Sequence, residues 1–289
     1  MIDTPRQAKQ WITSFIEEFI NIDPDNTLQL ETGEKAWEKP LVGFANGADD
    51  YFPFFKKDIG EFFWLPKEAL QKGYSEIDFE PSKLTVISWA IPHTKQIKME
   101  HRKATQIPSE RWSRARLYGE AFNNKLRQRV VDVLTHKGYH AVSPMLLPSF
   151  RREDSAKYGY ASSWSERHAA FVCGLGTFGL SDGLITPVGK AVRFGSVIAD
   201  IEVEPSQRPY NDPHHYCLFF RDNSCTKCAE RCPVNAITDD GHDKAKCKNF
   251  IREKLTPAIK SNYKIEIHAC GLCQTKVPCE SKIPKPSQV

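Results

Sequence analysis

Eight of the nine cysteines in this 289-residue chain lie between residues 217 and 279, and the ninth is Cys173. The segment opens with CLFFRDNSCTKCAERCPVN, which matches a C-x2-C-x2-C-x3-C-P pattern except that Asp222 stands where the first thiolate is expected. So sharp a change in composition indicates a cysteine-bearing module joined to a different domain. We therefore expect two domains, over residues 1–205 and 206–289.

The eight clustered cysteines form two sets of four, the number that two 4Fe–4S clusters require. In two-cluster ferredoxins the cysteine that precedes proline ligates the other cluster. Under this crossover one cluster is held by Cys217, Cys225, Cys228 and Cys279, and the other by Cys232, Cys247, Cys270 and Cys273. Cys217 then supplies the thiolate that is missing at Asp222.

Two other interpretations of these cysteines remain open. Pairs of the C-x2-C type also bind structural zinc, although the Cys-Pro signature and the uneven spacing favour iron–sulfur clusters. A disulfide framework is less favoured, because disulfides are rare in cytosolic proteins. Cys173 lies outside both sets, and we expect it to be a buried, unreactive thiol.

The composition is that of an ordinary soluble protein, with 40% hydrophobic and 26% charged residues. The net charge of +4 is spread along the chain, which favours a solvated surface over a nucleic-acid-binding one. No apolar run is long enough to cross a bilayer, and residues 1–20 have the periodicity of an amphipathic helix instead of an export signal. We expect a cytoplasmic protein with no membrane partner.

The apolar run at 84–92 predicts a buried strand, and residues 113–139 predict a helix that stops at Gly138. A second strand follows from residue 140, and this β-helix-β order is typical of an α/β or α+β domain. Residues 21–80 read as a loop-rich region. Residues 184–203 read as a hairpin of alternating strands.

The sequence GLGTFG at 174–179 matches the dinucleotide-binding pattern G-x-G-x-x-G. That pattern requires a strand before it, whereas a capping box at Ser163 and Glu166 predicts a helix that Gly174 ends. We therefore reject dinucleotide binding. The glycines are expected to let the backbone pass close to a flat ligand or to another strand.

With this cysteine pattern and this glycine segment, the chain resembles epoxyqueuosine reductase-like, cobalamin-dependent iron–sulfur proteins, which are relatives of reductive dehalogenases. The resemblance covers roughly residues 84 to 280. It is carried by VISWAIP, by Arg116-Leu-Tyr118-Gly119, by Glu166-Arg167 followed by GLGTFG, and by the eight-cysteine pattern with GLCQ.

The resemblance implies a nitroreductase-like domain that carries base-off cobalamin, followed by a ferredoxin-like domain with two 4Fe–4S clusters. Electrons would pass from a low-potential donor of ferredoxin or flavodoxin type, through both clusters, to the cobalt. The residues implied in cobalamin binding are Tyr118, Gly174, Leu175, Gly176, Thr177, Phe178, Gly179, Arg193, Phe194, Gly195 and Ser196, with the last four forming a turn. A D-x-H-x-x-G motif is missing, so His214 and His215 are interpreted as loop residues.

The chain departs from epoxyqueuosine reductases at Tyr160, which stands where they carry a catalytic aspartate, six positions before Glu166. Tyrosine can also donate a proton, so we expect Tyr160 either to be the catalytic acid or to pack as an aromatic residue. The sequence given also stops soon after Cys279, without the helical repeats that help many tRNA-acting members bind tRNA. We therefore expect a reductase of a small molecule or modified nucleotide. The alternatives are a tRNA epoxyqueuosine reductase and an electron-transfer protein or corrinoid activator without its own substrate.

Overall fold

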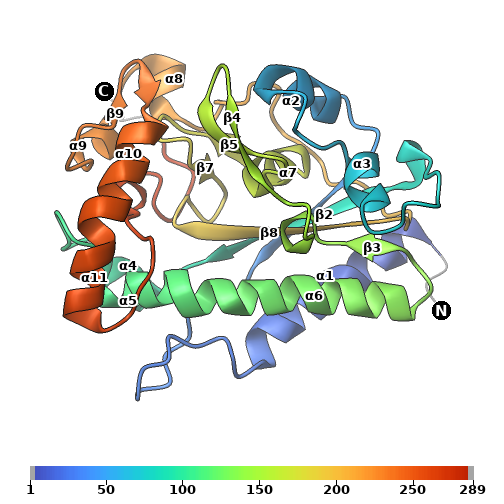
Figure 1. Cartoon of the computed structure of the whole chain (residues 1–289), viewed down its shortest axis with the longest axis horizontal. Helices are drawn as coiled ribbons and strands as arrows, with labels where there is room; N and C mark the ends of the chain where they lie inside the picture. Colours follow the sequence, from blue (N-terminus) through green and yellow to red (C-terminus); the bar gives the residue numbers. More distant parts are fainter. Residues whose placement is uncertain (1–3, 286–289) are drawn as a thin grey trace.

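The computed structural model describes residues 4–285, and its centre is a four-stranded antiparallel sheet of order β1-β2-β8-β3 (Figure 1). The strands are β1 (Leu41–Asn46), β2 (Thr85–Pro92), β8 (Val192–Ala199) and β3 (Ala141–Val142). β2 pairs with β8 over its whole length, and every residue of β2 is buried. Burial on both faces explains why the run at 84–92 is continuously apolar, and the predicted strand is confirmed.

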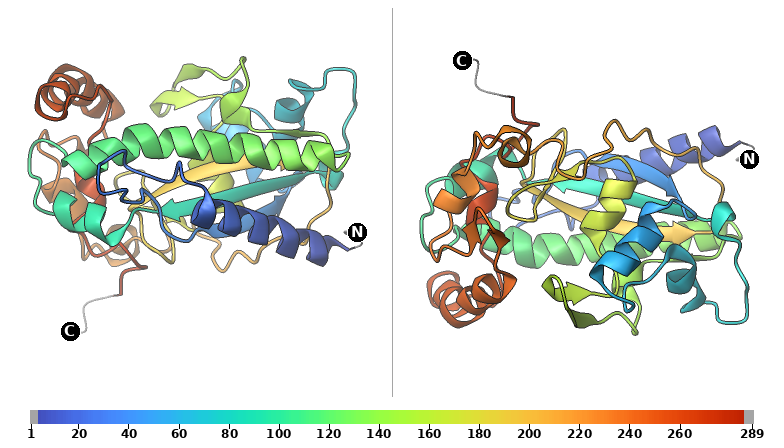
Figure 2. Two further views of the ribbon diagram at one scale, coloured as in Figure 1. Left: turned by 90° about the horizontal axis from the view of Figure 1, so that it is seen from below. Right: turned by 90° about the horizontal axis from the view of Figure 1, so that it is seen from above.

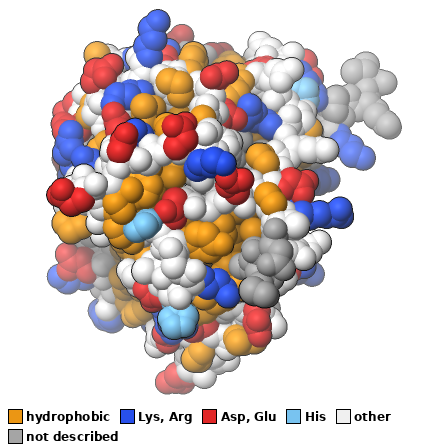
Figure 3. Space-filling view, turned by 90° about the vertical axis from the view of Figure 1, so that its right-hand side faces the viewer, with side chains coloured by type: hydrophobic (Ala, Val, Ile, Leu, Met, Phe, Trp, Pro, Cys, Tyr) orange, Lys and Arg blue, Asp and Glu red, His pale blue; other side chains and the backbone are white. Residues whose placement is uncertain are grey.

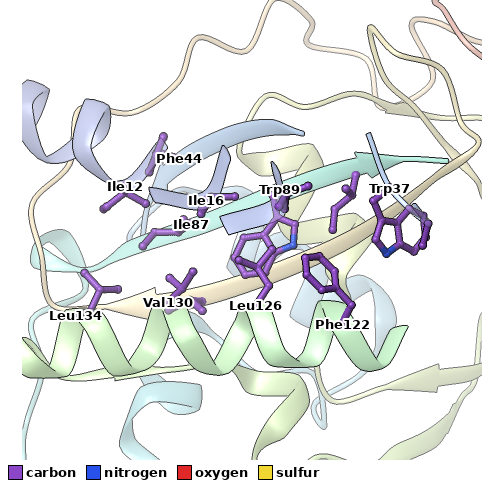
Figure 4. Packing of buried hydrophobic residues seen from close by; sticks show 14 of the residues in the cluster. Ile12, Ile16, Trp37, Phe44, Ile87, Trp89, Phe122, Leu126, Val130 and Leu134 are labelled. Carbon is purple, nitrogen blue, oxygen red and sulfur yellow. The ribbon is translucent and has the colours of Figure 1, made fainter. Parts of the chain in front are cut away.

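Helices α1 (Pro5–Ile22) and α6 (Glu120–His136) cover one face of the sheet, as Figure 2 shows. Their apolar side chains meet those of the strands in one core (Figure 4). The members of this core that Figure 4 labels are Ile12, Ile16, Trp37, Phe44, Ile87, Trp89, Phe122, Leu126, Val130 and Leu134. The amphipathic helix predicted at the N-terminus is thus confirmed, and the Thr4 side chain caps it.

The other face of the sheet is covered by α2 (Tyr51–Ile59), α3 (Pro66–Gln71) and α7 (Glu166–Val172). The expectation of a loop-rich region over 21–80 is confirmed in part: turns and loops make up most of it, but β1, α2 and α3 also lie in it. Phe52, Phe55 and Ile59 recur at helical spacing and are buried, and this packing stabilises α2 despite the proline in its first turn.

The helix predicted over 113–139 is confirmed, with a start three residues earlier. It consists of α5 (Glu110–Arg114), a π-helical segment η2 (Ala115–Gly119) and α6. The Ser109 side chain caps α5, and Gly138 follows α6 with φ of +92°. The remaining short elements of this part are α4 (Lys95–His101), η1 (Pro81–Lys83), η3 (Pro144–Leu146) and the hairpin of β4 (Arg152–Ser155) with β5 (Gly159–Ser162).

Three local expectations need correction. α7 is capped by the side chain of Ser165, not Ser163, because the Ser165 hydroxyl accepts from the amide of His168. The segment 184–203 is no simple hairpin, since β7 (Leu184–Ile185) pairs with β6 (Thr177–Phe178) while β8 joins the central sheet. The predicted turn at 193–196 lies inside β8, where Gly195 faces Trp89 so closely that a Cβ would lie 2.4 Å from the indole.

The cysteine-rich segment lies at one end of the sheet, at the left of Figure 1. Its elements are α8 (Leu218–Asp222), α9 (Lys227–Glu230), β9 (Ile237–Thr238), β10 (Gly241–His242), α10 (Lys244–Phe250), the π-helical η4 (Ile251–Leu255), α11 (Thr256–Tyr263) and η5 (Leu272–Gln274). The whole is a mixed α+β fold whose cysteine-rich region is consistent with a ferredoxin-like domain. The ion pair between Arg102 and Glu280 ties this region to α4, and the domain boundary near residue 205 stays a prediction.

The face of the molecule away from the cysteines carries acidic, basic and apolar side chains that are interspersed (Figure 3). This mixture agrees with the solvated surface expected from the scattered charges. Within the part of the chain that the structure describes, no helix is long and apolar enough to span a membrane.

Candidate functional site

Four cysteines line one small cavity beside α8 and α9. This first cysteine group consists of Cys217, Cys225, Cys228 and Cys279. Cys217 precedes α8 directly, and α8 places it beside Cys225 and Cys228 although the chain between them is long. The carboxylate of Asp222 is exposed and accepts hydrogen bonds from Ser224 and Arg221 instead of entering the cavity.

A second cysteine group consists of Cys232, Cys247, Cys270 and Cys273. Burial, and then repulsion from Cys273 and Cys232, raises the pKa of Cys247 to about 12. Burial and repulsion from Cys273 likewise raise the pKa of Cys270 to about 12. Cys273 also acts on Cys228, whose pKa is raised to about 11 chiefly by burial, so the two groups adjoin each other.

The two groups have the same membership as the sets assigned by the crossover. All nine cysteines are within the described range and are free thiols, so none of the eight is consumed by a disulfide. A donor set of four sulfurs is what a 4Fe–4S cluster uses, and the residues present fit that cofactor. Across residues 4–285, no three His, Cys, Asp or Glu side chains converge tightly enough to hold a single metal ion. The cluster ligation itself stays a prediction.

Lys190 lies inside the first cysteine group, and sequence reasoning missed it. Its side chain is buried, lines the same cavity, and donates a hydrogen bond of 3.1 Å to the Ser181 hydroxyl. Burial lowers the pKa of Lys190, but the cysteines around it, Cys279 and Cys228 first among them, raise it above its ordinary value. The only signal in the sequence was a lysine inside an otherwise apolar stretch after a Pro-Val-Gly turn.

A network of charged side chains on α6 and β8 centres on Glu120. Its carboxylate lies 2.8 Å from Arg193 Nη2, 3.0 Å from Arg127 Nη1 and 3.5 Å from Arg116 Nη1. Burial would raise the pKa of Glu120, but these arginines hold it well below its usual range. Repulsion by Arg193, together with burial, lowers the pKa of Arg116 to about 9. Positive charge is therefore in excess around this one carboxylate.

Glu166 extends the network to α7. Its Oε1 lies 3.2 Å from Arg127 Nε, and its Oε2 accepts a 2.5 Å hydrogen bond from the Ser196 hydroxyl. Arg127 is 1% exposed and also donates to the carbonyl oxygen of Phe194 at 2.8 Å. Burial raises the pKa of Glu166 although Arg127 opposes that shift. Ser196, one of the expected cofactor residues, thus orients a buried carboxylate.

Arg167, the next residue on α7, connects the network to the second cysteine group. Its side chain is exposed to solvent, although the protein around it lowers its pKa by desolvation. Arg193 acts on it in the same direction, whereas Asp182, Cys273 and Cys247 oppose the shift. We call Arg116, Arg152, Arg167 and Arg193 the arginine cluster, since Arg116 and Arg167 are each within electrostatic reach of Arg193, and Arg116 also of Arg152.

Tyr160 lies on β5, against the helix that carries Cys247. Its phenol oxygen accepts a hydrogen bond from Arg152 across the hairpin. The ammonium of Lys248 lies 4.2 Å from the ring centroid, one residue beyond Cys247. The expected acid thus lies beside Arg152 of the arginine cluster and against α10, which carries Cys247, and its catalytic role stays a prediction.

The glycine segment 174–179 packs mainly within the protein. The amide of Gly176 donates to the Tyr210 hydroxyl, and a Cβ there would lie 2.2 Å from the Ile185 carbonyl oxygen. The amides of Gly174, Leu175, Phe178 and Gly179 donate to backbone carbonyls, and Thr177 pairs with Ile185. Close approach to another strand is thus confirmed, whereas cobalamin contacts by these residues stay a prediction.

Three further expectations concern single residues. Cys173 is fully buried, and burial raises its pKa, which agrees with an unreactive thiol. His214 and His215 lie in a turn, as expected for loop residues. Tyr118 lies in η2 and packs with the apolar cluster next to Cys270, and its role in cobalamin binding stays a prediction.

Sequence and structure comparisons relate the chain to known proteins. No family model matches the chain. A 119-residue segment is 31% identical to the epoxyqueuosine reductase of Bacillus anthracis, and it covers 39% of this chain and 29% of that protein's length. The chain is thus a distant relative of epoxyqueuosine reductases, and the match spans less than a third of that relative.

Solved structures share the fold over 98% of this chain. One is an epoxyqueuosine reductase with an epoxyqueuosine-modified tRNA-Tyr stem loop, with a TM-score of 0.52, 17% identity and 68% of that chain covered. Another is a reductive dehalogenase whose structure suggests a mechanism for B12-dependent dehalogenation, with a TM-score of 0.53, 15% identity and 33% covered. The similarity to reductive dehalogenases is therefore structural.

Proposed function

We propose that this chain is a reductase that holds two 4Fe–4S clusters in its two cysteine groups and a cobalamin beside the arginine cluster. The observation that carries the proposal is that α10 packs against β5, which carries Tyr160, while Cys247 of α10 lies within electrostatic reach of Arg167. When bound, the clusters would carry single electrons and the cobalamin would supply the reducing centre. The substrate class proposed is a small molecule or a modified nucleotide.

The chain's own residues would bind, orient and supply the proton. The arginine cluster suits the phosphate and amide groups of a cobalamin, because guanidinium groups donate several hydrogen bonds from fixed positions. Glu120 and Arg127 would hold Arg193 and Arg116 in place. Tyr160 would give its phenolic proton to the substrate, and Arg152 would then stabilise the charge on the oxygen.

A low-potential donor of ferredoxin or flavodoxin type is the proposed electron source. The first cysteine group is the proposed entry, because α10, which carries Cys247 of the second group, lies against Tyr160. Electrons would then pass from the first group to the second, whose Cys273 lies within electrostatic reach of Cys228.

Cobalamin binding tests this proposal. The chain with reconstituted clusters would be titrated anaerobically with cobalamin and with cobinamide, which lacks the lower base, and binding would be followed by absorbance. We expect saturable binding that Arg167→Met weakens about tenfold, as for loss of one charge-assisted hydrogen bond. Arg6→Met, on the exposed side of α1, is the matched control. Absence of binding at saturating cobalamin would contradict the proposal.

Epoxyqueuosine in tRNA is the second candidate substrate, and the names of the relatives favour it. Tyr160 stands where epoxyqueuosine reductases carry a catalytic aspartate, and this difference argues for a different substrate. The two candidates are separated by expressing the chain in a strain that lacks epoxyqueuosine reductase and measuring queuosine in its tRNA. Restored queuosine would establish the second candidate.

A further inference from the structure

Lys190 is a buried cation placed among cysteine sulfurs. It is 3% exposed, and its side chain lines the cavity formed by the first cysteine group. Its ammonium donates a hydrogen bond to the neutral hydroxyl of Ser181. A buried ammonium with one neutral acceptor is strongly unfavourable unless negative charge lies nearby. The four sulfurs of the first cysteine group line the same cavity, and as the thiolates of a bound cluster they would supply that negative charge.

The backbone fixes Lys190 in this position. Thr186 and Gly189 form a tight turn with reciprocal hydrogen bonds of 3.1 and 2.8 Å. The amide of Lys190 then donates to the carbonyl oxygen of Cys279 at 2.8 Å, and the next amide, of Ala191, donates to Glu280 at 3.1 Å. The turn and the segment that carries Cys279 are thus paired, so the ammonium stays beside the first cysteine group.

We infer that Lys190 sets the reduction potential of the cluster held by the first cysteine group, raising it so that this cluster accepts the donor's electron. The inference rests on the cluster half of the proposed function and adds a residue that the cysteine pattern does not reveal. Lys190 is a positioning residue: its fixed charge acts on the cluster, and it does not contact the substrate.

The physical reason is electrostatic. In each reduction the donor loses one electron and the cluster gains it, no covalent bond changes, and the cluster with its thiolates becomes one charge more negative. A fixed cation in a low-dielectric cavity stabilises the more negative state, and net charge around a cluster is one of the factors that set its potential. The second group also has cations nearby, Arg231 and Arg167, but both are accessible to solvent, so water screens their charges.

The test compares reduction potentials in Lys190→Met, Lys190→Arg and the unmodified chain. Iron and sulfide are counted first, and the two cluster signals are then titrated against potential by electron paramagnetic resonance. Cys225→Ser identifies the signal of the first group. Lys56→Met, a half-buried lysine on α2, is the control for removing a lysine elsewhere. Lys190→Gln keeps a donor for Ser181 without the charge.

We expect Lys190→Met and Lys190→Gln to lower the reduced-to-oxidised ratio of the first cluster at least tenfold at a fixed potential, a shift of 59 mV for one electron. The second cluster should shift less, and Lys190→Arg should stay near the unmodified value. Unchanged potentials, or equal shifts of both clusters, would overturn the inference. Loss of the first cluster in both neutral variants would also overturn it, since Lys190 would then serve assembly. If the unmodified chain holds no iron, the proposed function fails instead.

Discussion

The backbone N–H of Lys190 donates a 2.8 Å hydrogen bond to the carbonyl oxygen of Cys279. This contact joins the turn after β7 to the most C-terminal cysteine of the first group. The position of that cysteine therefore depends on a residue of the sheet-containing part of the chain. Gly189 makes the approach possible, because it has φ of +85° and a Cβ there would lie 2.1 Å from the Glu280 carbonyl oxygen.

Gly189→Ala should displace the segment that carries Cys279. The added methyl group meets backbone, which cannot move aside as a side chain can, so we expect a loss of about 3 kcal/mol in the free energy of unfolding. The first cluster should be lost in preference to the second. Denaturant unfolding and an iron count measure the two effects.

Gly33→Ala is the matched control for that substitution. Gly33 also has positive φ, of +65°, but a Cβ there meets nothing within 4 Å. We expect only the backbone strain, about 1 kcal/mol, and full iron content. Equal effects of the two substitutions would show that the close approach at Glu280 does not matter.

Glu120→Gln should destabilise the chain by roughly 3 kcal/mol, because it leaves Arg127 and Arg193 without their shared carboxylate. Urea unfolding at neutral pH measures the loss. Glu202→Gln, which removes an exposed ion pair with Lys83, should change stability by less than about 1 kcal/mol.

Glu120→Gln should also change how the free energy of unfolding depends on pH. The pKa of Glu120 is held well below its usual range, so its stabilising effect is complete above the unfolded-state value of about 4.3 and declines as pH falls below it. The unmodified chain should therefore lose more stability than Glu120→Gln when acidified from pH 6 toward pH 3. An equal loss of unfolding free energy in the two proteins over this pH range would contradict this assignment.

Tyr160→Phe should lower turnover about 100-fold if Tyr160 is the proton donor, with little effect on substrate binding. The epoxyqueuosine-modified tRNA stem loop is the first probe, and single turnover separates the chemical step from binding. Tyr158→Phe is the control, because Tyr158 lies on the same hairpin but its hydroxyl donates to Asp58. Unchanged turnover in Tyr160→Phe would leave Tyr160 as a packing residue.

The sequence was most informative where one local pattern determined the structure. The apolar run at 84–92 predicted β2, because a strand buried on both faces must be apolar throughout, whereas the division of the cysteines into two ligand sets stays a prediction. Gly195 was misassigned to a turn because its cause is distant: the Trp89 indole across the sheet fills the space that a side chain would need.

The arginine cluster and Lys190 could not be predicted from the sequence, for a different reason. Arg116, Arg167 and Arg193 come from η2, α7 and β8, and only the packing of these elements reveals that three cations lie near one another. Lys190 looks like an ordinary surface lysine until the turn at Gly189 docks against Cys279. Long-range packing, which spacing along the chain does not encode, decides such sites.

The central claim is that the two cysteine groups hold two 4Fe–4S clusters in the crossed arrangement. Iron, acid-labile sulfide and zinc would be counted in the anaerobically reconstituted chain and in the Cys279→Ala and Cys232→Ala variants. We predict about eight iron and eight sulfide per chain, with one cluster signal lost from each variant and a different one in each. Two zinc ions without sulfide, or loss of the same signal from both variants, would contradict the account.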